Sequence, residues 1–169
     1  MLGGIRSGKS RWAESAIAES VSPGDPVRYI ATGPADSDPS WSARVAAHRQ
    51  RRPAHWSTVE TANVATLLRD STATATLIDD VGGWLTAVLD SPDVDTDINE
   101  LSDAISGFGS TLVVVSPEVG LMVVPATESG RRFADLLGGL NQRLADICDK
   151  VVLIVAGQPV MVKDANGGQ

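Results

Sequence analysis

The chain has 169 residues, a formal net charge of −7 at pH 7 and a pI near 4.7. This length suits one domain with its own core, and the acidic balance argues against a broad nucleic-acid-binding surface, because such binding depends on neutralising phosphates. A lone cysteine, Cys148, cannot close an intrachain disulfide, and no apolar run reaches the roughly 20 residues of a membrane-spanning helix. We therefore expect a cytoplasmic protein without a membrane span.

A glycine-rich loop opens the chain. Residues 3–10 match the phosphate-binding motif G-x-x-x-x-G-K-[ST] completely, and a helical pattern follows at once. Backbone amides of such a loop and of the new helix can bind a nucleotide phosphate, with Lys9 reaching the β and γ phosphates and Ser10 coordinating Mg²⁺. The nucleotide-binding candidates in this loop are Gly3, Gly4, Ile5, Arg6, Ser7, Gly8, Lys9 and Ser10.

The segment ahead of this loop is short, since only Met1 and Leu2 precede Gly3. A phosphate loop ordinarily follows a buried strand, so either that strand is nearly absent or the natural start lies upstream. An unanchored loop has to be ordered when phosphate binds, at a cost of about 1 kcal/mol or more per residue fixed. We therefore expect a mobile loop and weak nucleotide affinity.

Helical and strand patterns alternate along the rest of the chain. A helix from Lys9 to about Val21 should end at the cluster Pro23–Pro26, and the apolar run Val27–Ala31 predicts a strand. Further strands are expected at Thr76–Ile78, Thr111–Val115 and Val151–Val155, and further helices at Ser40–Gln50, Asn63–Asp70, Trp84–Asp90, Thr96–Phe108 and Ser129–Asp149. This alternation predicts an α/β fold: one P-loop NTPase-like domain over residues 1–163, a mostly parallel central sheet flanked by helices, and a disordered tail over residues 164–169.

Arginines gather around a histidine on the helix predicted at Ser40–Gln50. Arg44 lies one turn before His48, and Arg49, Arg51 and Arg52 follow it. This concentration in an acidic protein indicates a bound anion, and an imidazole placed there can attack an α-phosphate to give a phosphoramidate. From the residues alone, a histidine at the edge of an apolar helix face is equally compatible. His55 is predicted to be structural or exposed.

Carboxylates follow several of the predicted strands. Asp79 and Asp80 end an apolar strand, where P-loop enzymes hold Mg²⁺ or its waters, and Asp79 is the better candidate, although acidic residues also form turns there. Glu60 is a weaker candidate for contacting a base or ribose. Glu118 follows a predicted strand, where it can either contact a ligand at the carboxyl edge of the sheet or cap the loop.

These motifs together resemble the bifunctional adenosylcobinamide kinase and adenosylcobinamide-phosphate guanylyltransferase family of cobalamin biosynthesis, over nearly the whole chain. Residues 3–10 resemble its G-G-x-R-S-G-K-S loop, and residues 29–32 its Y-I-A-T strand. Residues 44–60 resemble its R-I-x-x-H and R-P-x-x-W-x-T-x-E run, in which the histidine, here His48, is the guanylylated nucleophile. Further similarity lies in Leu77–Asp79, Trp84–Thr86, Glu118–Gly120, Val124–Pro125 and Asn141–Ala145.

The resemblance implies two transferase reactions in a homotrimer with sites between subunits. ATP or GTP phosphorylates adenosylcobinamide with help from Lys9 and Mg²⁺, and His48 then carries GMP from GTP to adenosylcobinamide phosphate, giving adenosylcobinamide-GDP. Besides the loop, the implied nucleotide-binding residues are Ala31, Thr32, Gly33, Arg49, Gln50, Arg51, Arg52, Glu60 and Asp79, and the implied metal ligands are Ser10 and Asp79.

Two other functions fit the residues without the resemblance. One is a monofunctional P-loop kinase of another small alcohol, in which His48 only binds phosphate, and the other is a nucleotide-binding switch or ATPase subunit. The chain also departs from the family in loops. The family usually has cysteine at Asp80, threonine at Gly82, asparagine at Ala87 and Pro117, and an acidic-methionine pair near Ser40 and Trp41.

Overall fold

Parallel strands and connecting helices account for most of the chain in the computed structural model, which describes residues 1–33 and 52–165. The strands are β1 (Leu2–Gly3), β2 (Val27–Ala31), β3 (Ser57–Glu60), β4 (Ala75–Asp79), β5 (Leu112–Pro117), β6 (Lys150–Val155) and β7 (Gln158–Asp164). The helices in these ranges are α1 (Lys9–Glu19), α3 (Val64–Asp70), α4 (Val81–Val88), α5 (Val94–Ser106) and α6 (Glu128–Ile147). The helix predicted at Ser40–Gln50 lies outside the described residues.

The strands form one sheet of seven in the order β3-β2-β4-β5-β1-β6-β7. Every neighbouring pair is parallel except β6 and β7, which form an antiparallel hairpin. The hairpin turn consists of Ala156 and Gly157, both in the left-handed region at φ 50° and 78°, as a tight two-residue turn between twisted strands requires. The predicted α/β class and the mostly parallel sheet are confirmed.

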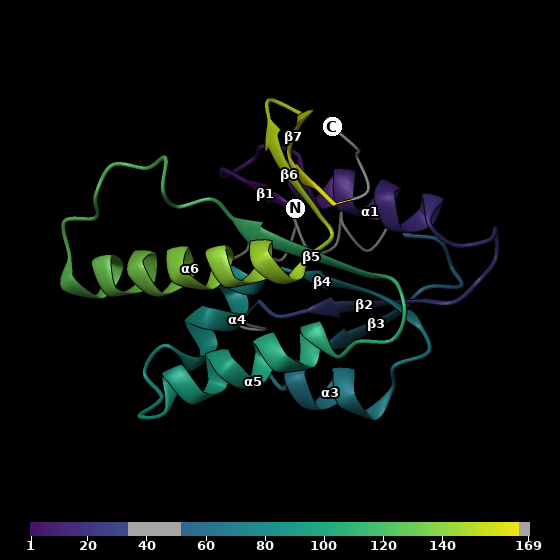
Figure 1. The fold of residues 1–169 in the computed structure, drawn as a ribbon, viewed down its shortest axis with the longest axis horizontal. Coiled ribbons are helices and arrows are strands. Elements are labelled where there is room, and N and C mark those ends of the chain that lie inside the picture. Colours follow the sequence, from purple (N-terminus) through teal and green to yellow (C-terminus); the bar gives the residue numbers. More distant parts are fainter. Residues whose placement is uncertain (34–51, 166–169) are drawn as a thin grey trace.

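Helices cover both faces of the sheet (Figure 1). On one face, Ala13 and Ile17 of α1 pack with Tyr29, Leu77 and Val115 from the strands. On the other face, α3, α4, α5 and α6 contribute to a larger apolar cluster with β2, β4 and β5. No helix in the described ranges is long and apolar enough to cross a membrane.

The short segment ahead of the phosphate loop does form a central strand. Leu2 and Gly3 pair with β5 on one side and with β6 on the other. Two further backbone hydrogen bonds flank this pairing, from the Ser116 amide to the Met1 carbonyl at 2.9 Å and from the Glu118 amide to the Gly3 carbonyl at 3.1 Å. The expectation that the loop lacks an anchoring strand is therefore corrected, because two residues held on both sides connect it to the middle of the sheet.

Besides β1, two strands were not predicted. β3 lies at one sheet edge and exposes three of its four residues, and β7 lies at the other edge with Val160, Met161 and Val162 between 50% and 60% exposed. Neither has the continuous buried apolar run of β4. β7 also includes Asp164, and the Ala165 amide donates to the Asp149 carbonyl at 2.8 Å, so the boundary predicted at residue 163 falls inside an ordered strand.

Candidate active site

The phosphate loop connects β1 to α1 through two left-handed residues, Arg6 at φ 55° and Gly8 at φ 94°. Gly8 is the N-cap of α1 and provides no side-chain hydrogen bond, so the first amides of the helix are left for an anion. A β-carbon at Gly3 would meet the Ile154 carbonyl oxygen at 2.9 Å and the Ser7 hydroxyl even closer. Gly8 thus allows the left-handed turn, and Gly3 allows the backbone to pass close to Ile154 and Ser7.

The end of β4 brings a carboxylate to this loop. Ser10 Oγ, in the first turn of α1, donates to Asp79 Oδ1 at 3.1 Å. The hydroxyl of Tyr29, from the neighbouring strand β2, donates to the other oxygen, Asp79 Oδ2. Burial, reinforced by the adjacent Asp79 carboxylate, raises the pKa of Tyr29 well above its usual range, so the phenol remains a donor. Asp79 is therefore held through both oxygens, and one of them contacts the helix that begins at Lys9.

Arg52 contacts this group through Tyr29. Its guanidinium carbon lies 3.2 Å from the centroid of the Tyr29 ring, and its Nη1 donates to Thr58 Oγ1 at 2.9 Å. The stacking on Tyr29 and the hydrogen bond to Thr58 of β3 together position the Arg52 guanidinium. One continuous set of contacts therefore runs from Arg52 through Tyr29 and Asp79 to Ser10.

Tyr29 is a residue that the sequence-based candidates did not include. Its only signal was its place in the Y-I-A-T segment, because a tyrosine in an apolar strand ordinarily indicates core packing. The structure assigns it a second role, since its hydroxyl fixes the Asp79 carboxylate.

The other predicted nucleotide-binding residues occupy the same edge of the sheet where they are described. Ala31 ends β2, and Thr32 and Gly33 follow it directly. The Ala31 carbonyl accepts from the Thr61 amide at 3.1 Å, directly beyond Glu60 at the end of β3. His48, Arg49, Gln50 and Arg51 lie outside the described residues. His55 is exposed in a turn.

Asp80 has a structural role. Its Oδ1 accepts from the Gly83 amide at 2.7 Å and caps α4. Burial raises the pKa of Asp80 above its usual value, although the Gly83 hydrogen bond and nearby Lys9 oppose the shift. The Asp80 carboxylate therefore caps α4, and burying its negative charge costs free energy.

The pKa of Asp80 predicts a pH-dependent effect of Asp80→Asn, which removes the charge and keeps an oxygen for the Gly83 amide. A raised folded-state pKa means that the stability contributed by the protonated carboxyl is complete at low pH and is lost as pH rises through the folded pKa. We expect the stability advantage of D80N over the wild type to widen as pH rises above the usual range of an aspartate. Urea unfolding across that range measures it, and an advantage that shrinks with pH would contradict it.

Gly82 and Pro117, two positions at which the resemblance leads us to expect other residues, are in contact. A β-carbon at Gly82 would lie 2.7 Å from Cγ and 3.0 Å from Cδ of the Pro117 ring. Gly82 is buried in the first turn of α4, and Pro117 ends β5. The proline ring fills the space that a threonine side chain at position 82 would occupy. Glycine at position 82 and proline at position 117 therefore depend on each other for close packing.

This contact predicts that Gly82→Thr and Pro117→Asn are not additive. G82T alone should destabilise the protein by about 1–3 kcal/mol, the usual range for overpacking. In the double variant the asparagine removes the clashing ring, and most of that loss should be recovered. Urea unfolding of the wild type, both single variants and the double variant measures the coupling, and simple additivity would show that the two sites are independent.

Comparison with known proteins identifies the family of the chain. The family model described as cobinamide kinase / cobinamide phosphate guanyltransferase matches residues 1–162. A bifunctional adenosylcobalamin biosynthesis protein, CobP, of Pseudomonas aeruginosa is 43% identical over 169 residues, covering 96% of this chain and 95% of the relative. The bifunctional CobU proteins of Escherichia coli and Salmonella typhimurium are each 35% identical over 183 residues, covering 96% of this chain and 98% of each relative. The chain therefore belongs to the cobinamide kinase / cobinamide phosphate guanyltransferase family.

Proposed function

We propose that this protein phosphorylates adenosylcobinamide and then transfers GMP to the product, as an enzyme of adenosylcobalamin biosynthesis. In the first reaction the aminopropanol hydroxyl attacks the γ-phosphorus of ATP or GTP, the bond to the β-phosphate breaks, and the hydroxyl proton is released. In the second, the His48 imidazole attacks the α-phosphorus of GTP and pyrophosphate leaves. A phosphate oxygen of adenosylcobinamide phosphate then attacks the same phosphorus, the P–N bond breaks, and adenosylcobinamide-GDP forms.

The observation that carries this proposal is the arrangement of the phosphate loop against Asp79. Lys9 begins α1 beside amides that have no capping side chain, and Ser10 lies 3.1 Å from a carboxylate that Tyr29 holds in place. These groups bind and orient the triphosphate before reaction, which is the main contribution a protein makes to phosphoryl transfer.

The residues present also suit Mg²⁺. A serine hydroxyl and a carboxylate are hard oxygen donors, and magnesium in kinase sites uses one or two carboxylates together with substrate phosphates. Ser10 and Asp79 would hold the ion, which when bound neutralises charge on the phosphates. Tyr29 contributes by keeping the Asp79 carboxylate in one orientation.

The arginines of the His48 segment would contact the nucleotide in the second reaction. Among them Arg52 is described, and its stacking on Tyr29 joins this segment to the phosphate loop. We therefore infer that Arg49, Gln50, Arg51 and Arg52, with Ala31, Thr32, Gly33 and Glu60, surround the same nucleotide that the loop binds. One bound GTP could then present its γ-phosphate to the acceptor or its α-phosphate to His48.

We further infer a cytoplasmic homotrimer. The family resemblance supports the trimer, and so does β7, an edge strand whose Val160, Met161 and Val162 are half exposed. An apolar edge strand of this kind invites cover by another chain. The lone cysteine agrees with a reducing compartment.

Incubation with GTP labelled at the α-phosphate tests the proposal. The label should stay on the denatured protein and move to adenosylcobinamide-GDP when adenosylcobinamide phosphate is added. GTP labelled at the γ-phosphate should leave the protein unlabelled, because pyrophosphate departs. Turnover of adenosylcobinamide without any α-label on the protein would instead indicate a kinase alone, and nucleotide hydrolysis without either would indicate an ATPase or switch.

A further inference from the structure

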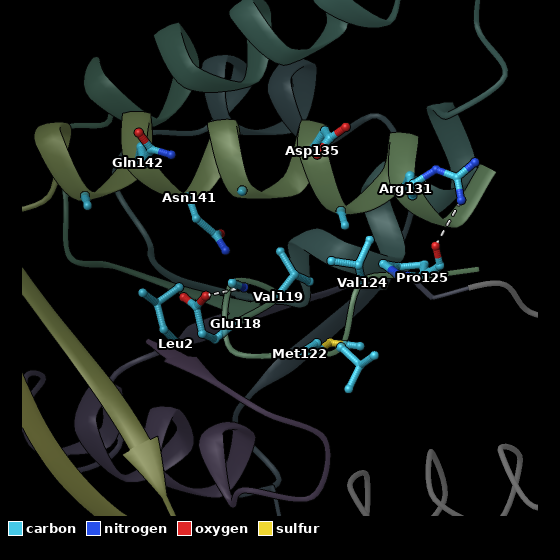
Figure 2. Close-up of a pocket in the computed structure, with 15 residues that line it drawn as sticks. Leu2, Glu118, Val119, Met122, Val124, Pro125, Arg131, Asp135, Asn141 and Gln142 are labelled. Carbon is cyan, nitrogen blue, oxygen red and sulfur yellow. Dashed lines mark hydrogen bonds between the residues drawn. The ribbon is translucent and has the colours of Figure 1, made fainter. Parts of the chain in front are cut away.

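A cavity of about 460 Å³ lies beside the phosphate loop, on the face of the sheet opposite α1 (Figure 2). It is bounded by α6 and by the loop that follows β5. Leu2, which lines the cavity, directly precedes Gly3, and Glu118 donates its backbone N–H to the Gly3 carbonyl at 3.1 Å. The cavity and the phosphate loop therefore share the end of β1 as a common wall.

Hydrogen bonds hold the walls of this cavity in place. Arg131 of α6 donates to the carbonyls of Pro125 at 3.2 Å and Ala126 at 2.8 Å, which fastens the loop to the helix. Deeper in, the Asn141 side chain donates to the Pro117 carbonyl at 2.9 Å and accepts from the Ser116 hydroxyl at 2.6 Å. The cavity is thus formed before a ligand arrives, as is usual for small-molecule sites.

The two walls differ in chemistry. The loop wall is apolar except for Glu118 at its start, and its Met122, Val123 and Val124 side chains are between 62% and 91% exposed. The helix wall presents Asp135 and Gln142, whose side chains make no hydrogen bond with any described residue. This combination suits a ligand that has an apolar face and also carries hydrogen-bonding groups along its edge.

We propose that this cavity is the acceptor site, which binds the edge of the corrinoid ring of adenosylcobinamide and of its phosphate. The inference rests on the proposed function and assigns the substrate's place in it. A corrin ring has apolar faces and amide-bearing arms, which match the loop wall and the helix wall respectively. The volume lies within the roughly 300–1,000 Å³ of small-molecule sites but is too small for a whole corrinoid, so an edge enters and the exposed loop covers one face.

Two adjacent glycines in α6 provide a matched pair of test positions. Glycine inside a helix is about 1 kcal/mol less favourable than alanine. Gly138 lines the cavity, and a β-carbon there would meet only Val119, at 4.0 Å. The neighbouring Gly139 is exposed, does not line the cavity, and has nothing within 4 Å of such a carbon. A leucine at 138 therefore enters the cavity, whereas a leucine at 139 enters solvent.

The test compares Gly138→Leu, Gly139→Leu and the wild type. For G138L we expect the KM for adenosylcobinamide to rise about tenfold or more, as when a side chain occupies a binding pocket, with an unchanged Kd for GTP and no loss of melting temperature. G139L should keep the wild-type KM. Gln142→Leu, which removes a polar group from the wall without filling the cavity, should raise the same KM by a smaller factor.

Several outcomes would overturn the assignment. A G138L enzyme with the wild-type KM would show that the acceptor binds elsewhere, and equal KM increases in G138L and G139L would indicate a general disturbance of α6. A change in oligomeric state that accompanies the loss in G138L would make the cavity a subunit interface instead. Failure of the wild type to form the labelled GMP adduct or to turn over adenosylcobinamide would contradict the proposed function itself, independently of these variants.

Discussion

His48→Ala abolishes guanylyl transfer, which is the largest effect that we expect from any single substitution. The imidazole is the proposed nucleophile, so its removal leaves no group to accept GMP from GTP. GTP should still bind with nearly its wild-type affinity, because the phosphate loop at residues 3–10 is untouched. The measurement is retention of α-labelled GMP on denatured protein, together with a GTP binding titration.

His55→Ala is the matched control for this substitution, since the chain has only two histidines and His55 is exposed in a turn. H55A should form the adduct as the wild type does. The adduct of the wild type should be hydrolysed by acid and survive base, as a phosphoramidate does. Parallel loss of GTP binding and of the adduct in H48A would instead identify a structural histidine.

Lys9→Ala should lower the rates of both reactions by roughly 10² to 10³, the usual effect of losing one well-placed charged contact to a transition state. Both reactions pass through the same triphosphate site in our proposal, so both should fall together. The rate of adenosylcobinamide phosphorylation and the rate of GMP adduct formation are measured separately at saturating GTP.

Lys150→Ala is the control for Lys9→Ala. Lys150 begins β6 and is exposed, so it lies at the opposite end of the parallel strands from the phosphate loop. K150A should retain both rates. Full activity in K9A would mean that residues 3–10 do not bind the reacting phosphates, and loss of only one reaction would mean that the two reactions use different nucleotide sites.

The local sequence was sufficient to predict those helices, strands and turns whose residues show a recognisable spacing or periodicity. The tight turn between β1 and α1 was predictable because the glycines of residues 3–10 occur at the spacing of a phosphate-binding loop, with a helical pattern directly after them. β2, β4, β5 and β6 were predictable because buried parallel strands have short β-branched apolar runs, and the described helices because apolar residues recur at helical spacing.

Tertiary pairing decided the rest. β1 has two residues, too few for any periodicity, and is a strand only because β5 and β6 hold it on both sides. β3 and β7 are edge strands whose residues are mostly exposed, so they lack the pattern of a buried strand and their pairing partners define them.

The candidate site divides in the same way. The sequence by itself made Lys9, Ser10 and Asp79 candidates for nucleotide handling, from their motifs and from their places at strand and helix ends. Only the tertiary structure joined Tyr29 and Arg52 to them, because these contacts bridge segments far apart in the chain and no local pattern records them. The same holds for the cavity, whose walls come from β1, the loop after β5 and α6 and meet only because β1 lies beside β5.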